Sequence, residues 1–318
     1  MGTCHAVVPG DPPLVVESNS EGRTRLPSGA ATALLLAVLL WASNAIAIKV
    51  VLREIDPLTL TWLRYAIACA LYAPYALVLR RSAVPYSRRE RWLLLAGGIT
   101  VVPIFNLTLY YALSFTTAAN ASLVRLTEPA WVLLLAALLF GERARPRQLA
   151  GLGLALAGTL ALVLLGRRAG GGERHVLGMV LMVANSFAWI AYILCSKDLI
   201  RHRNAMLVTA HVSLIGAGVL AVTTGVSHAP AVTAAALRLS PTGWALVLYL
   251  AVAVTVGSNL LFSFGLKRLT AGAASSYAYL IPICTALLAW LVLGEPITAL
   301  LVTCGLIISA GVYLVNRA

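Results

Sequence analysis

The stretch Tyr111-Ala-Leu-Ser-Phe-Thr-Thr-Ala-Ala-Asn-Ala-Ser122 reappears, with substitutions, as Phe264-Gly-Leu-Lys-Arg-Leu-Thr-Ala-Gly-Ala-Ala-Ser275, 153 residues further along the chain. The same shift pairs several more positions without a gap: Asn106 with Asn259, Pro129 with Pro282, Gly141-Glu142 with Gly294-Glu295, and Gly158 with Gly311. A shift of 148 residues pairs Trp41 with Trp189 and Lys49 with Lys197. The chain therefore contains an internal duplication.

The composition indicates that this duplicated unit lies in a membrane. Of 318 residues, 60% are apolar and 11% carry a charge, whereas a soluble domain carries about 25% charged residues. The apolar residues form continuous blocks of about 20, the length of a membrane-crossing helix, and do not alternate as barrel strands would. We predict an all-α integral membrane protein with ten transmembrane helices, near 29–51, 57–79, 91–113, 117–140, 147–166, 176–198, 204–226, 241–264, 271–293 and 297–316.

Each copy contains five of these helices, an odd number, so the second copy enters the membrane upside down. Charge supports this arrangement: Arg143-Ala-Arg-Pro-Arg147 follows Gly141-Glu142, but no Lys or Arg directly follows Gly294-Glu295. Loops rich in Lys and Arg stay in the cytoplasm, and this rule predicts that both termini are cytoplasmic and that the protein lies in the plasma (inner) membrane. The same loops explain the net charge of +13, so we expect no nucleic-acid partner. We expect a disordered cytoplasmic tail over 1–28 and two inverted five-helix repeats over 29–166 and 176–317.

Only one acidic residue, Glu128, lies near the middle of a predicted helix, and Arg125 lies three residues earlier on the same helix face. An isolated carboxylate in the membrane is costly, so it pairs, takes a proton or lines a wet cavity. Two interpretations stay open: Glu128 binds a proton or a substrate ammonium, or Arg125 and Glu128 form a structural ion pair. We expect Lys49 to extend to the membrane surface, and Arg64 to pair with another helix, with Glu128 as a candidate partner.

Polar and aromatic side chains that recur in both copies are candidates for a substrate cavity. With the charged pair and weaker additions, the candidates are Trp41, Asn44, Asn106, Tyr110, Asn120, Arg125, Glu128, Trp189, Tyr192, Asn259 and Tyr277. Pro129 and Pro282 each remove a helical hydrogen bond, which favours kinks that open and close a pathway. The small-residue runs 151–155 and 305–309 permit close helix packing, either within a unit or at a homodimer seam.

The sequence contains no pattern typical of an enzyme. Only one acidic residue lies deep in a predicted helix, the histidines are scattered along the sequence, and the sequence has no phosphate-binding loop. We therefore expect no catalytic residues, no cofactor and no metal. A secondary carrier for a small molecule remains, with coupling to protons as a further hypothesis. A passive facilitator or channel, and a non-transporting scaffold, are the alternatives.

The motifs together resemble the drug/metabolite transporter superfamily, in particular its EamA type. The resemblance rests on Trp41-Ala-Ser-Asn-Ala-Ile-Ala-Ile-Lys49, Leu63-Arg-Tyr65, Thr117-Ala-Ala-Asn-Ala-Ser122, Pro129 and the two Gly-Glu pairs. It implies ten helices, a central cavity lined by helices 1, 3, 4, 6, 8 and 9, and export of amino acids, metabolites or drugs. One departure is that Glu precedes Pro in the fourth helix, as Glu128-Pro129, whereas Ile281 holds the ninth-helix position.

Overall fold

The computed structural model describes residues 28–80, 85–140, 145–168, 172–224, 228–266, 277 and 279–316. Within these ranges the chain is helical and contains no strand. Apart from Ser28, the expected tail over 1–28 lies outside the described residues. Gly141-Glu142 and most of the first half of the helix expected over 271–293 also lie outside them.

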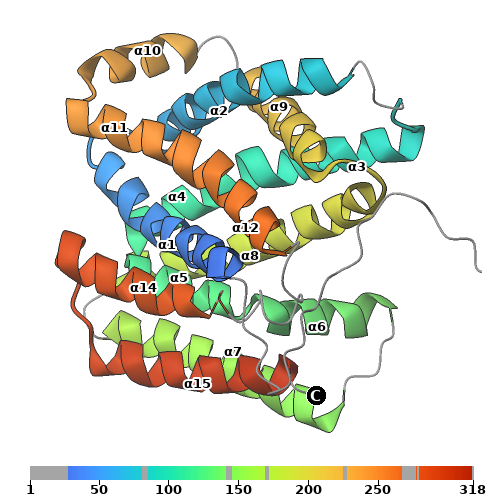
Figure 1. Cartoon of the computed structure of the whole chain (residues 1–318). Coiled ribbons are helices and arrows are strands. Elements are labelled where there is room, and N and C mark those ends of the chain that lie inside the picture. Colours follow the sequence, from blue (N-terminus) through green and yellow to red (C-terminus); the bar gives the residue numbers. More distant parts are fainter. Residues whose placement is uncertain are drawn as a thin grey trace, which may run out of the picture.

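The α-helices are packed on one another in a bundle (Figure 1). They are α1 (Ser28–Val51), α2 (Pro57–Arg80), α3 (Arg88–Ile99), α4 (Asn106–Phe115), α5 (Ala118–Leu126), α6 (Glu128–Phe140), α7 (Pro146–Gly166), α8 (Gly172–His202), α9 (Ala205–Thr224), α10 (Ala229–Arg238), α11 (Pro241–Tyr249), α12 (Ser258–Leu266), α14 (Leu280–Leu288) and α15 (Ala299–Asn316). Three π-helical segments continue α-helices: η1 (Thr100–Phe105), η4 (Leu250–Gly257) and η5 (Ala289–Leu293).

The bundle has the surface of a membrane protein. Seven helical stretches in the described ranges are long and apolar enough to cross a bilayer, and Leu280–Leu293 is a shorter apolar helix. Large apolar side chains point outward on many of them, as Leu160, Val222 and Leu306 do. Such a surface would associate or aggregate in water but is stable against lipid. The predicted all-helical, multi-pass membrane fold is confirmed in this form.

Several helix boundaries differ from the predicted ones for physical reasons. The connection expected over 227–240 contains α10, an alanine-rich helix with Pro230 in its first turn, where the missing N–H costs nothing. Helix α3 begins at Arg88, three residues before the predicted start, because Ser87 and Glu90 form a capping box. Pro103 has no N–H to donate, and the helix around it widens into η1.

The helix expected over 117–140 is divided into α5 and α6 at Thr127. Pro129 follows two residues later and cannot donate the hydrogen bond that an uninterrupted helix would direct to the carbonyl of Arg125. Pro282, in contrast, is buried in the first turn of α14, where a proline is tolerated. Pro282 nevertheless follows a turn at Tyr279, inside the helix predicted over 271–293.

Helices α7 and α15 lie side by side (Figure 1) because glycines bring their backbones together. A Cβ placed on Gly151 would lie 2.6 Å from the carbonyl oxygen of Gly311, and a Cβ on Gly311 would lie 2.5 Å from the backbone nitrogen of Ala155. Gly151 and Ala155, at the two ends of the small-residue run 151–155, therefore pack against α15 of the same chain.

A single methyl group at Gly151 should destabilise the protein, because it collides with backbone that cannot move aside. We expect Gly151→Ala to lower the free energy of unfolding by about 1–3 kcal/mol. The matched control is Gly153→Ala, two residues along the same helix, where nothing lies within 4 Å of the added Cβ. Thermal unfolding of both variants in detergent tests this. Equal melting temperatures for the two would contradict the close packing of α7 on α15.

Candidate functional site

Arg125 and Glu128 face each other across the interruption between α5 and α6. Arg125 Nε lies 3.2 Å from Glu128 Oε1, and the two side chains are 33% and 19% exposed. Thr127 ends α5 between them, and Glu128 opens α6, where its negative charge interacts favourably with the helix dipole. The ion pair expected from the spacing is therefore present.

Aromatic rings surround the guanidinium of this pair. Arg125 Cζ lies 5.3 Å from the centroid of the Phe105 ring and 5.6 Å from that of Trp189. The Trp189 ring lies 5.2 Å from Phe105 and 5.3 Å from Tyr192 between ring centroids. Cation–π contacts of this kind stabilise a partly desolvated guanidinium. The fold thus brings together four predicted residues and adds Phe105, which no sequence pattern had singled out.

Polar atoms without partners extend this cluster along α8 and α6. Asn185 donates from Nδ2 to the Phe105 carbonyl at 2.6 Å and to Thr108 Oγ1 at 3.2 Å, but its buried Oδ1 has no hydrogen-bond partner within the described ranges. The buried Nε1 of Trp131 also lacks one there, and its ring packs against Phe187. Buried polar atoms are normally satisfied, so a water or ligand group is expected here.

A second buried polar cluster surrounds Arg64, with side chains from α1, α2, α4 and η4. Its side chain donates from Nε to Thr255 Oγ1 at 2.9 Å and from Nη1 to Tyr110 Oη at 2.8 Å and Asn44 Oδ1 at 3.3 Å. Arg64 does bind other helices, but the predicted pairing with Glu128 is wrong because the carboxylate of Glu128 is bound by Arg125. The structure brings Asn44 and Tyr110 together here.

The other predicted cavity residues have separate surroundings. Asn106 donates from Nδ2 to Tyr65 Oη at 3.0 Å and to the Val101 carbonyl. Asn259, its counterpart in the repeat, is exposed and donates to the Thr255 carbonyl of its own helix. Three residues complete the set: Trp41 packs against Phe262, the Asn120 N–H is capped by Thr117, and Tyr277 is half-buried.

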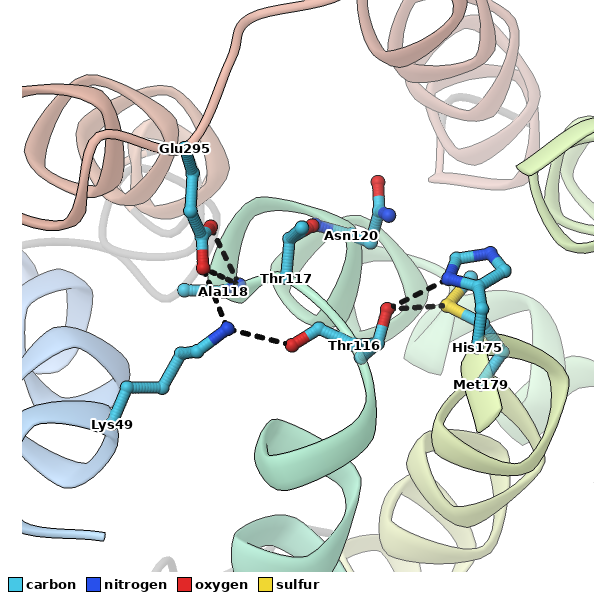
Figure 2. A network of polar contacts seen from close by, with 8 residues as sticks. All are labelled: Lys49, Thr116, Thr117, Ala118, Asn120, His175, Met179 and Glu295. Carbon is cyan, nitrogen blue, oxygen red and sulfur yellow. Dashed lines mark hydrogen bonds and ion pairs between the residues drawn. The ribbon is translucent and has the colours of Figure 1, made fainter. Parts of the chain in front are cut away.

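A further ion pair joins Lys49 at the end of α1 to Glu295 after η5 (Figure 2). Lys49 Nζ lies 2.6 Å from Glu295 Oε1 and donates to the Thr116 carbonyl at 2.8 Å. The other carboxylate oxygen of Glu295 accepts the N–H of Ala118, the first residue of α5, at 2.9 Å. Lys49, in the last turn of α1, thus has a carboxylate partner in Glu295.

This contact continues to α8 through Thr116. Figure 2 shows the Thr116 hydroxyl near the His175 ring and the Met179 sulfur, with His175 Nδ1 3.1 Å from Thr116 Oγ1. In the turn after α1, Glu54 accepts the backbone N–H and the hydroxyl of Ser240. The backbone hydrogen bond holds the pKa of Glu54 below its ordinary value. These contacts tie together five parts of the chain: the end of α1, the connection from α4 to α5, α8, the residue before α11 and the segment after η5.

Removal of the Glu295 charge should destabilise the protein, because it leaves a largely buried ammonium without its counter-ion. We expect Glu295→Gln to lower the free energy of unfolding by about 3 kcal/mol. Glu173→Gln is the control, because Glu173 is 93% exposed and 4.0 Å from Arg167, and such surface pairs contribute little. Thermal unfolding in detergent measures both. The interpretation fails if the two substitutions lower the melting temperature equally.

Comparison of the chain with known proteins finds similarity to transporters. The sequence model of the EamA-like transporter family matches residues 28–164 and again 176–317. An uncharacterized transporter of Archaeoglobus fulgidus is 32% identical over 289 residues, 88% of this chain and 95% of the relative. A probable amino-acid metabolite efflux pump of Escherichia coli is 33% identical over 169 residues, 53% of each chain. A solved structure, described only as a protein, aligns over 90% of this chain and 96% of its own with a TM-score of 0.57 and 25% identity.

Proposed function

Because this chain belongs to the EamA-like transporter family, we propose that it is a secondary transporter that exports amino acids or related small metabolites. The observation that carries the proposal is the Arg125–Glu128 pair, which lies at a helix interruption among aromatic rings and unsatisfied buried polar atoms. The carboxylate of Glu128 and the apolar ring faces match the ammonium and the side chain of an amino acid. The name of the Escherichia coli relative agrees with this substrate class.

The proposed topology has ten transmembrane helices in the inner membrane, as two inverted units over 29–166 and 176–317, with both termini and the tail 1–28 in the cytoplasm. The two successive matches to the family model support the duplication. So does the position of the π-helices, because the shift of 153 residues places η1 over part of η4. No homodimer through α7 and α15 is included, because these helices pack on each other.

Alternating access is the proposed mechanism, because two similar halves can exchange their arrangements around one central site. The contact between Lys49 and Glu295 supports a closed state at one end of the path, since it ties α1 to α5. The interruption before Pro129, with Pro282 in the other half, is the proposed position of bending. In this scheme Glu128 exchanges a proton for the substrate ammonium, which couples export to the proton gradient.

Transport by reconstituted protein tests this function. Liposomes loaded with each of the common amino acids in turn should take up the radiolabelled form of a substrate by counterflow, and uptake should saturate. Unsaturable flux without counterflow would instead identify a channel or facilitator. The absence of flux for every amino acid would contradict the proposed substrate class.

Glu128→Gln should abolish the dependence of this uptake on a pH gradient while counterflow persists, because glutamine neither binds nor releases a proton. The control is the exposed acid in Glu173→Gln, which should retain full dependence. If gradient-driven uptake by Glu128→Gln equals that of the wild type, Glu128 serves only in a structural ion pair.

A further inference from the structure

Arg64 is a buried cation whose partners are all uncharged. It is 6% exposed in α2, a helix of the membrane bundle. The residues that accept its hydrogen bonds, Thr255, Tyr110 and Asn44, are neutral. A guanidinium in the membrane interior is expensive unless an opposite charge or water compensates it.

The acidic side chains that the structure describes are engaged elsewhere. Their partners are Ser240 for Glu54, Thr59 for Asp56, Arg203 for Glu90, Arg125 for Glu128, Arg167 for Glu173 and Lys49 for Glu295. Arg125 therefore has a counter-ion, whereas Arg64 has none among these carboxylates. Of Arg64 and Arg125, Arg64 is the one whose positive charge is available to a ligand.

The surroundings of Arg64 also contain unused hydrogen-bond donors. Its Nη2 amino group takes part in none of the three hydrogen bonds that Nε and Nη1 form. Tyr110 accepts from Arg64 and so keeps its own O–H proton to donate, and Asn44 uses only its Oδ1, which leaves the Nδ2 amide to donate. Three donor groups from α1, α2 and α4 thus meet around one positive charge.

Thr255 holds the guanidinium in place from the opposite side. Its hydroxyl accepts from Arg64 Nε and donates to the Leu250 carbonyl at 2.8 Å, a span of five residues that fits the π-helix η4. The Thr255 carbonyl accepts the Tyr72 hydroxyl at 3.3 Å. Arg64 is therefore oriented before any ligand arrives, and π-helical segments often occur at functional sites.

We propose that Arg64, with Tyr110 and Asn44, forms a carboxylate-binding subsite of the transport path. The proposal rests on the proposed transport function and makes it more specific: the exported molecules carry a carboxylate, which Arg64 binds with charge-assisted hydrogen bonds. Arg125, already neutralised by Glu128, is not the carboxylate receptor.

Binding of a matched pair of small probes tests the subsite without any transport step. Phenylacetate and phenylacetamide have the same ring and nearly the same shape, but only the first carries a charge. Phenylacetate should raise the melting temperature of the purified full chain, and phenylacetamide should raise it much less. Arg64→Gln should weaken phenylacetate binding about tenfold or more. The exposed Arg147→Gln, which removes the same charge elsewhere, should not. Equal binding of phenylacetate by the wild type and Arg64→Gln would overturn the proposal.

Asn44→Asp provides a second test that does not depend on the folding of Arg64→Gln. The new carboxylate would occupy the position of an oxygen that Arg64 already binds at 3.3 Å. It should raise the melting temperature without ligand and abolish the difference between phenylacetate and phenylacetamide. Retention of that difference would overturn the subsite. Because neither test uses a proton gradient or Glu128, their failure is distinguishable from failure of the proposed function.

Discussion

The placement of charge inside the bilayer determines much of this structure, because hydrocarbon does not solvate an ion. Three of the cations that the structure describes lie inside the bundle, two with a carboxylate partner and one without. Lys49 and Arg125 have carboxylate partners in Glu295 and Glu128. Arg64 is held by neutral oxygens alone, in the described part of the chain. This contrast separates two charges that are compensated by the protein from one that a substrate can compensate.

The contacts of these charges coincide with places where helices are irregular. Glu128 begins a helix directly after Thr127 ends one, and Arg64 is oriented by Thr255 in a π-helical segment. Irregular backbone in a membrane is tolerated where it is buried in protein or lines a cavity. In contrast, α7 and α15 pack through glycine, and no ion pair of either helix is seen among the described residues. In the proposed mechanism, the irregular helices are the ones suited to move.

Much of the fold was predictable from the sequence, because membrane helices need long apolar blocks and these are visible directly. The Arg125–Glu128 pair was predictable too, since residues three apart on a helix are neighbours. The Lys49–Glu295 contact was not, because 246 residues separate its members and hydropathy carries no information on which helix ends meet. For the same reason Arg64 was assigned the wrong partner. Phe105 was missed because an apolar ring in an apolar helix gives no signal of its own.

The central claim is that the two ends of the path open in turn, and that the contact between α1 and Glu295 must break for transport. Cysteines at positions 49 and 295 in a background without native cysteines, joined by a bifunctional methanethiosulfonate reagent, test it in liposomes. The account predicts that joining them stops counterflow of the transported amino acid and that reduction with dithiothreitol restores it. Undiminished counterflow by the fully cross-linked protein would contradict it.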